Sequence, residues 1–206
     1  MSKTKDWVGD NKSIFKQLGA SAHCSEEREE HDFYATDPKA IDDLLKYETF
    51  DKNIWECAVG QGHLAERLKQ YGHNVKCSDL IDRGYPGTEV IDFLTQSHDF
   101  NGDIITNPPY KYCNEFILNS LNSIPNGNKV AMFLKITSLE GRKRYEEIYS
   151  KYPPKTIYVY VSRASCAKNG DFNKRNNKGE YHSAVCYAWF VWVKGEYEST
   201  ELKWIV

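Results

Sequence analysis

Short apolar segments alternate along most of this chain with amphipathic stretches of about ten residues, and this alternation constrains the fold more than any other feature. Two strands joined by a helical crossover run parallel, so the repetition predicts a three-layer α/β fold whose mostly parallel sheet has helices on both faces. The expected strands are Asn53–Ala58, Val75–Asp79, Thr88–Ile91, Asp103–Thr106, Lys129–Ile136, Lys155–Val161 and Ser183–Val193. The expected helices are one opened by Thr36-Asp37-Pro38, then His63–Tyr71, Tyr112–Ile124 and Arg142–Ser150.

The 206 residues suit one domain, which we place at residues 33–206 after an N-terminal arm of residues 1–32. The arm contains the charge run Glu26-Glu27-Arg28-Glu29-Glu30, which is typical of a solvated segment. No apolar run reaches the roughly 18 residues of a membrane span, and the first residues lack the apolar core of a signal peptide. We therefore expect a cytoplasmic protein with no membrane partner.

Six cysteines are scattered without a C-x-x-C pair or a histidine at ligand spacing, so no metal site is expected. The formal net charge of −2 gives no overall attraction for a polyanion. If nucleic acid is a partner, a local basic patch has to bind it.

A glycine turn follows the first expected strand, in the sequence Glu56-Cys57-Ala58-Val59-Gly60-Gln61-Gly62. Gly60 and Gly62 permit a sharp turn and the close approach of a ligand to the backbone. The next helix then offers free N–H groups, and Asp79 at the end of the next strand can accept both hydroxyls of a ribose. These features predict a site for a nucleoside cofactor.

The same turn also fits the dinucleotide fingerprint G-x-G-x-x-A with an acidic residue about 20 positions later. A glycine turn that binds no ligand is a further alternative. Glu56 favours a different cofactor, because a carboxylate at the strand end repels a diphosphate but can hold the cationic amino acid end of S-adenosylmethionine.

Asn107-Pro108-Pro109-Tyr110 directly follows the fourth expected strand. The two prolines end the strand and stiffen the turn, and Asn107 is biased toward an extended backbone because a proline follows it. An ordinary surface turn is the alternative, since Asn-Pro and Pro-Pro pairs are common turn markers.

This platform suits the methylation of a planar amino group, whose lone pair is delocalised and weakly nucleophilic. Two acceptors aimed at its two N–H groups favour a pyramidal nitrogen and free the lone pair. We expect the side-chain oxygen of Asn107 and the carbonyl of Pro108 to be these acceptors, with Pro109 fixing the direction of the carbonyl. Tyr110 offers a ring on which a base can stack.

With these motifs the chain resembles class I S-adenosylmethionine-dependent amino-methyltransferases, in particular the N6-adenine DNA methyltransferases of small orphan or phage type. The resemblance spans roughly residues 32–193 and implies a Rossmann-like methyltransferase fold whose seven-stranded sheet has an antiparallel last strand, here Ser183–Val193. It implies a cofactor-binding role for Tyr34, Thr36, Glu56, Gly60, Gly62, Asp79, Asp92 and Phe93. In that family the pair matching Asp92-Phe93 recognises the cofactor's adenine ring.

The chain has no room for the large target-recognition domain that many DNA methyltransferases carry. Between the last two expected strands, residues 163–178 contain five basic residues and one acidic residue. We expect this loop to bind nucleic acid, although a solvated loop is the alternative. Its basic residues are Arg163, Lys168, Lys174, Arg175 and Lys178.

Together these features lead us to expect an adenine-specific DNA methyltransferase that flips its target base against Tyr110. Methylation of RNA adenine or of a protein glutamine amide remains an alternative, because the same acceptors serve all three amines. The chemistry also leaves cytosine N4 open. A catalytically silent binding module is the alternative from a different class.

Overall fold

The structure is a computed structural model that describes residues 34–95, 98–162, 166–168 and 185–206. Its strands are β1 (Tyr34–Thr36), β2 (Asn53–Glu56), β3 (Asn74–Asp79), β4 (Glu89–Val90), β5 (Asp103–Thr106), β6 (Lys129–Lys135), β7 (Thr156–Tyr160), β8 (Cys166–Lys168), β9 (Tyr187–Val193) and β10 (Glu201–Ile205). Its helices are α2 (Lys39–Leu45), α3 (His63–Gln70), α4 (Cys113–Ser123) and the single turn α5 (Arg142–Arg144). Two 3₁₀ turns, η1 (Tyr110–Tyr112) and η2 (Ile136–Leu139), and the π-helical turn η3 (Tyr145–Tyr149) complete the elements.

Eight strands form the main sheet in the order β10-β7-β9-β6-β5-β2-β3-β4. All neighbours pair in parallel except β9, which runs antiparallel to both β6 and β7. The chain winds from β2 outward through β3 to β4 and then returns to the other side of β2 as β5. This reversal is the topological switch point, where α/β sheets bind their ligands.

The predicted α/β class and the antiparallel strand near the end are confirmed, but the predicted number of seven strands is wrong. The eighth strand is β10, which pairs in parallel with β7 at the edge of the sheet. Of its five residues only Ile205 is buried. The expected strand around Thr88–Ile91 shrinks to the two exposed residues of β4.

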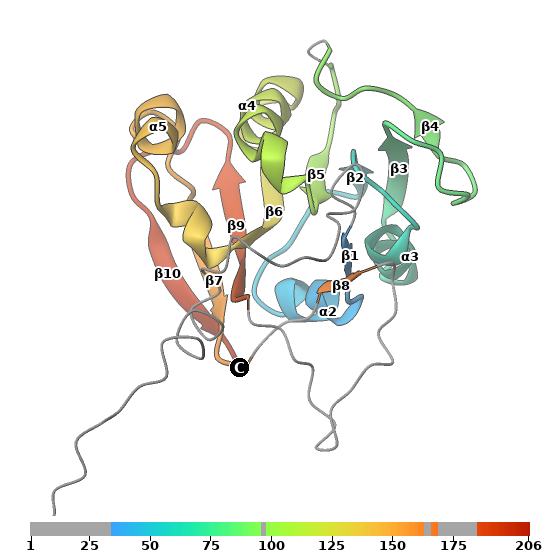
Figure 1. Cartoon of the computed structure of the whole chain (residues 1–206), viewed down its shortest axis with the longest axis horizontal. Helices are drawn as coiled ribbons and strands as arrows, with labels where there is room; N and C mark the ends of the chain where they lie inside the picture. The colour runs from blue at the N-terminus through green and yellow to red at the C-terminus, as the bar shows by residue number, and fades with distance from the viewer. Residues whose placement is uncertain (1–33, 96–97, 163–165, 169–184) are drawn as a thin grey trace, which may run out of the picture.

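Helices cover the two faces of the sheet (Figure 1). One face packs against α2 and α3 through Ile41, Leu64 and Leu68, and the other packs against α4 and η3. In β6 alternate residues go to opposite cores, with Met132 on the α4 face and Phe133 on the α2 face. Because both faces are buried, the strand is apolar throughout, as expected for a central strand of an α/β sheet.

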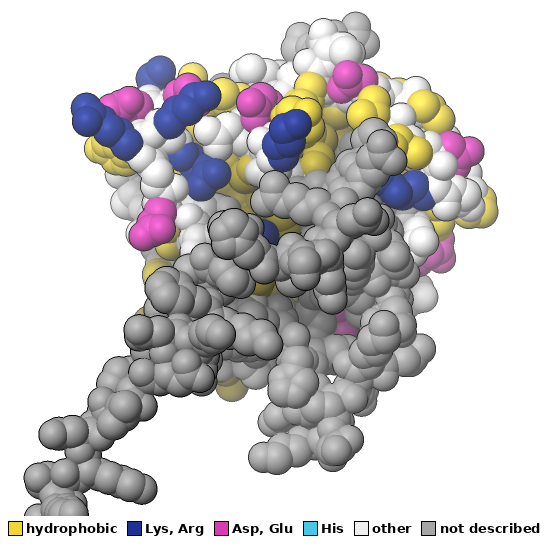
Figure 2. All heavy atoms as spheres, viewed as in Figure 1, with side chains coloured by type: hydrophobic (Ala, Val, Ile, Leu, Met, Phe, Trp, Pro, Cys, Tyr) yellow, Lys and Arg dark blue, Asp and Glu magenta, His cyan; other side chains and the backbone are white. Residues whose placement is uncertain are grey.

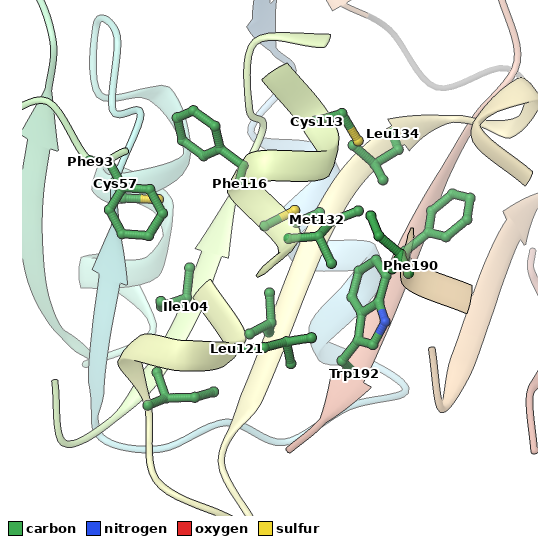
Figure 3. Packing of buried hydrophobic residues seen from close by; sticks show 14 of the residues in the cluster. Cys57, Phe93, Ile104, Cys113, Phe116, Leu121, Met132, Leu134, Phe190 and Trp192 are labelled. Carbon is green, nitrogen blue, oxygen red and sulfur yellow. The ribbon is translucent and has the colours of Figure 1, made fainter. Parts of the chain in front are cut away.

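The core on the α4 face is drawn in Figure 3, where side chains of the sheet interlock with those of α4. Phe116 and Leu121 come from α4, whereas Ile104, Met132 and Phe190 come from three neighbouring strands. This packing holds the end of β5 and the start of α4 in place, and the tetrapeptide lies between them.

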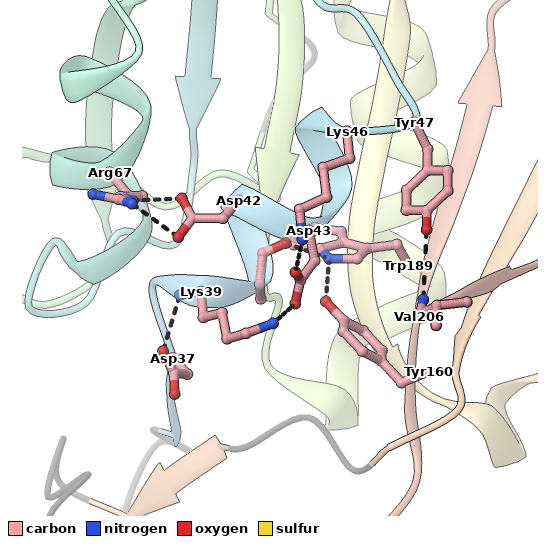
Figure 4. Close-up of polar contacts among 11 residues, drawn as sticks. Asp37, Lys39, Asp42, Asp43, Lys46, Tyr47, Arg67, Tyr160, Trp189 and Val206 are labelled. Atoms are coloured by element: carbon pink, nitrogen blue, oxygen red, sulfur yellow. Dashed lines mark hydrogen bonds and ion pairs between the residues drawn. The ribbon is translucent and has the colours of Figure 1, made fainter.

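Polar contacts anchor α2 and the residues just before it (Figure 4). Asp37 accepts a hydrogen bond from the backbone N–H of Lys39 at 2.9 Å, which confirms the predicted helix start. Trp189 Nε1, in the sheet, donates to the carbonyl of Ala40 at 3.0 Å. Arg67 of α3 donates to both carboxylate oxygens of Asp42, at 2.5 and 2.9 Å. These bonds fix α2 against the sheet and against α3.

A separate two-stranded antiparallel ribbon joins β1 to β8. Tyr34 is paired with Lys168 and Thr36 with Cys166. The segment before α2 is thereby tied to a segment more than a hundred residues later in the chain. Within the described ranges, no helix has the length and apolar character needed to cross a membrane.

Candidate active site

A cavity of about 880 Å³ opens at the carboxyl ends of β2, β3 and β5, beside the switch point. Five of the predicted cofactor-binding residues line it, together with all four residues of the tetrapeptide. Tyr34 and the two glycines of the turn are not among its lining residues. The lining residues from the predicted set are Thr36, Glu56, Asp79, Asp92, Phe93, Asn107, Pro108, Pro109 and Tyr110. Residues from four separate strand ends and loops therefore meet in one place.

The glycine turn is built as the sequence predicts, with a positive φ of 56° at Gly60 and 82° at Gly62. Val59 N–H donates to the carbonyl of Ser78 at 3.0 Å, and Gly62 N–H donates back to Val59 at 2.8 Å. These bonds hold the turn against the end of β3. The left-handed backbone favours glycine at both positions.

At Gly62 the structure shows a packing reason for the absence of a side chain. A Cβ at this position would lie 2.2 Å from the ring of Tyr85, far inside van der Waals contact. Tyr85 is nearly buried, and Lys69 Nζ donates to its hydroxyl at 2.8 Å. The missing side chain thus makes room for an aromatic ring of the protein itself.

Asp79 connects the turn to the cavity. Its Oδ2 accepts the N–H of Gly60 at 2.8 Å, and its Oδ1 accepts the N–H of Ile81 at 3.1 Å. A carboxylate offers about four lone-pair sites, so two backbone bonds leave capacity for further donors. The side chain of Asp79 lines the cavity, and the two hydrogen bonds that it accepts from backbone N–H groups hold its orientation.

Glu56 is the last residue of β2 and is almost completely buried, with 2% of its surface exposed. Burial raises the pKa of its carboxyl well above the ordinary value, and the nearby Asp79 raises it further. The atom Oε2 has no hydrogen-bond partner within the described ranges. A buried carboxylate with an unsatisfied oxygen is costly unless a cation or donor meets it.

Asp92 and Phe93 both line the cavity, but they differ in exposure. Asp92 is exposed, and its Oδ1 accepts the N–H of Leu94 at 3.0 Å. Phe93 is buried between the rings of Trp55, His98 and Phe116, with centroids 5.2 Å away in each case. Phe93 therefore forms a wall of the cavity that continues into the core.

The tetrapeptide begins where β5 ends, as the sequence predicts. Asn107 Nδ2 donates to Thr36 Oγ1 at 2.8 Å. Pro109 has φ −59° and ψ 120°, and its carbonyl accepts the N–H of Tyr112. In the described part of the chain no group donates to the carbonyl of Pro108.

Tyr110 is half-buried, with two neighbours near its ring. Lys135 Nζ lies 4.6 Å from the ring centroid, and the ring of Tyr187 lies 6.2 Å away. Lys135 ends β6, the strand next to β5, and it also lines the cavity. Lys135 was not predicted from the sequence. A lysine at the carboxyl end of an apolar parallel strand does, however, indicate a position at the ligand-binding edge of the sheet.

His63 and Cys57 also line the cavity and were not predicted. Burial lowers the pKa of His63, so its imidazole is neutral near pH 7. Burial raises the pKa of Cys57 well above the usual value for a thiol, so Cys57 stays protonated and is no nucleophile. Among the described residues no group of His, Cys, Asp and Glu is arranged to hold a metal ion.

Several predicted positions cannot be placed in the cavity. For Tyr34 and Lys168 only the backbone pairing of β1 with β8 is described. The N-terminal arm of residues 1–32 lies outside the described residues. So do Arg163, Lys174, Arg175 and Lys178 of the expected nucleic-acid-binding loop.

Comparison with solved structures identifies the architecture. A candidate modification subunit of a type I restriction enzyme from Vibrio vulnificus is similar over 92% of this chain, with TM-score 0.51 and 11% identity. The chain has the class I methyltransferase fold. A class I S-adenosylmethionine-dependent methyltransferase candidate from Listeria monocytogenes matches 82% of it (TM-score 0.50, 12% identity), and an RNA methyltransferase candidate from Pyrococcus horikoshii matches 76% (0.50, 13%).

This methyltransferase fold is shared across proteins of different length. The aligned part spans 52% of the Vibrio chain, 62% of the Listeria chain and 80% of the Pyrococcus chain. No model of a known protein family and no curated protein matches the sequence.

Proposed function

We propose that this protein transfers a methyl group from S-adenosylmethionine to the exocyclic N6 amine of adenine in DNA. The observation that carries the proposal is that Asn107-Pro108-Pro109-Tyr110 lines the same cavity as Glu56 and Asp79. A rigid pair of acceptors for an amine and a set of carboxylates suited to this cofactor are thereby within one pocket.

The residues of the cavity fit the cofactor. Glu56, whose buried Oε2 has no hydrogen-bond partner among the described residues, suits the cationic amino group of the methionine part. Asp79 retains lone pairs for ribose hydroxyls, and the exposed Asp92 can accept from the adenine amine. When bound, S-adenosylmethionine would supply an electrophilic methyl group to the substrate nitrogen.

The chain's own contribution is to hold the amine and to raise its nucleophilicity. The Asn107 side-chain oxygen and the Pro108 carbonyl accept the two N–H groups, which localises the nitrogen lone pair. The restricted backbone angles of Pro109 fix the direction in which the Pro108 carbonyl points. These acceptors are in place before the reaction, so no reorganisation is needed in the transition state.

Tyr110 and its surroundings suit a planar aromatic substrate. The Tyr110 ring lines the cavity next to the tetrapeptide, and a base can stack on such a ring for about 1–3 kcal/mol. The basic residues at positions 163–178 give a further reason to favour a polyanion. An RNA adenine and a glutamine amide offer the same kind of nitrogen, and they are the alternative substrates.

Labelled S-adenosylmethionine, incubated separately with DNA, RNA and protein pools, tests the proposal. Label in DNA, recovered as N6-methyladenine by nucleoside mass spectrometry, is the expected result. Label in protein or RNA alone would contradict the assignment of the substrate, and N4-methylcytosine would contradict the assignment of the base.

Replacing Asn107 with alanine tests the chemistry. We expect Asn107→Ala to lower the turnover number by about 10²-fold or more, because a preorganised partner of the reacting amine is lost. Cofactor affinity, measured by calorimetry, should be retained. Asn101→Ala, at an exposed position outside the cavity, is the matched control and should keep wild-type turnover. Wild-type turnover in Asn107→Ala would contradict the role given to Asn107.

A further inference from the structure

A hydrogen bond joins the tetrapeptide to the segment before α2. Asn107 Nδ2 donates to Thr36 Oγ1 at 2.8 Å, across 71 positions of sequence. Thr36 is buried, with 3% of its surface exposed, and both residues line the cavity. A contact of this length between an amide and a hydroxyl is well within hydrogen-bond geometry.

We propose that Thr36 is a positioning residue that holds the Asn107 side-chain amide in place at the edge of the cavity. The inference rests on the proposed function and goes beyond it, because the family resemblance implies only contact with the cofactor for Thr36. The amide carries an acceptor oxygen on one side and two N–H donors on the other. Thr36 Oγ1 accepts from the donor side, and this bond restrains the amide whose oxygen is to meet the amine.

The position of this amide decides whether the site can work. The substrate amine offers N–H donors, so it needs the oxygen of Asn107 within hydrogen-bond reach. Rotation about the last side-chain bond of asparagine is broad, so the side chain alone does not hold one position. A hydrogen bond to a fixed partner restricts this rotation.

Thr36 is suited to this task because its backbone is held on both sides. On its N-terminal side, β1 pairs with β8, and Thr36 itself is opposite Cys166. On its C-terminal side, Asp37 binds the N–H of Lys39, and α2 is bonded to Trp189 (Figure 4). Threonine is also branched at Cβ, which restricts its own rotamers. The acceptor for Asn107 is therefore fixed in space.

The kinetic test compares two substitutions. Thr36→Val keeps the shape of the side chain and removes the hydroxyl, and we expect it to lower kcat about tenfold while the cofactor Kd changes less than twofold. Thr36→Ser keeps the hydroxyl and should restore most of the lost kcat. Thermal unfolding of both variants checks that the fold is retained.

A different result would assign Thr36 to the cofactor instead. If Thr36→Val weakens cofactor binding in calorimetry while kcat at saturating cofactor equals that of wild type, the positioning role is overturned. The same holds if Thr36→Ser loses as much kcat as Thr36→Val, because the hydroxyl would then not be the group that matters.

A second readout needs no activity. The side-chain amide signal of Asn107 in a ¹⁵N spectrum can be assigned by its loss in Asn107→Asp. We expect its protons to exchange slowly with solvent in wild type and in Thr36→Ser, and faster in Thr36→Val. Equal exchange in wild type and Thr36→Val would overturn the inference. A wild-type protein that methylates no substrate but shows this exchange pattern would contradict only the proposed function.

Discussion

Replacing Gly62 with alanine perturbs the turn in two separable ways. The backbone at Gly62 has φ +82°, which an L-residue with a side chain adopts only with strain. The new Cβ would also lie 2.2 Å from the Tyr85 ring, so the ring has to move. Tyr85 is not free to move at low cost, because its hydroxyl donates to Glu66 and accepts from Lys69.

The two terms can be estimated from the structure. The left-handed backbone costs about 1–2 kcal/mol for a residue with a Cβ. Displacing a packed ring adds about 1–3 kcal/mol, as for other overpacked sites. The sum of about 2–5 kcal/mol should lower Tm by roughly 5–15 °C in a chain of this size. This would be a large fraction of the stability of a typical domain.

Gly84 provides the matched control. Its φ is +81°, and a Cβ built there meets nothing within 4 Å, so Gly84→Ala carries the backbone term alone. Thermal unfolding of both variants without cofactor should show Gly62→Ala as the more destabilised by about 1–3 kcal/mol. In a Tyr85→Ala background the added cost of Gly62→Ala should fall to that of Gly84→Ala, which a double-mutant cycle measures.

A specific result would refute this reasoning. If Gly62→Ala unfolds at the same temperature as Gly84→Ala but no longer binds S-adenosylmethionine, the glycine serves the approach of a ligand. The original interpretation of the turn from the sequence would then hold, and the packing of Tyr85 against Gly62 would not be the reason for the glycine.

Two further predictions concern charge. The raised pKa of Glu56 means that the folded protein keeps this proton to higher pH than the unfolded chain, so the free energy of unfolding should fall as pH rises above the ordinary Glu value of about 4.3. Glu56→Gln should flatten this fall in a series of Tm measurements at different pH without cofactor, and it should weaken cofactor binding. If Tm falls with pH as steeply as in wild type, Glu56 is not the source of the pH dependence. Replacing Lys174, Arg175 and Lys178 with glutamine should weaken DNA binding and reduce its log–log salt slope by about one unit per lost phosphate contact. A slope equal to that of wild type would return residues 163–178 to the role of a solvated loop.

The surface over α5 carries charges of both signs. Figure 2 shows Lys and Arg side chains over α5 interspersed with Asp and Glu. Arg142 pairs with Glu146 at 2.8 Å and Lys143 with Glu147 at 3.7 Å. Exposed pairs of this kind contribute little to stability, and they lower the net positive charge that α5 offers to a polyanion.

Features that depend on a few neighbouring residues could be predicted from the sequence. The alternation of strands and helices, the helix start at Asp37, the positive φ at Gly60 and the end of β5 before Asn107 all follow from local patterns. Local sterics and hydrogen bonding determine such features, so the nearest residues carry the information. The carboxyl ends of parallel strands then bring the glycine turn and the tetrapeptide to one edge of the sheet.

Edge elements and distant contacts could not be predicted in this way. β10 was not predicted, although Glu201-Leu202-Lys203-Trp204 alternates polar and apolar residues, and in the structure Leu202 and Trp204 are exposed at the edge of the sheet. The short α5 and the π-helical η3 replace the regular helix expected at Arg142–Ser150. Lys135 reaches the ring of Tyr110 only because β6 lies next to β5.

The sequence by itself determined the class of fold, the glycine turn and the stiff Asn107–Tyr110 platform, because each is encoded in adjacent residues. Only the tertiary structure decided what stands around them. It put Tyr85 against Gly62 and brought Thr36 to within 2.8 Å of Asn107. It also left Glu56 buried with an oxygen that no group in the described part of the chain meets. Such contacts depend on the order of strands in the sheet and on side-chain packing, which no local pattern specifies.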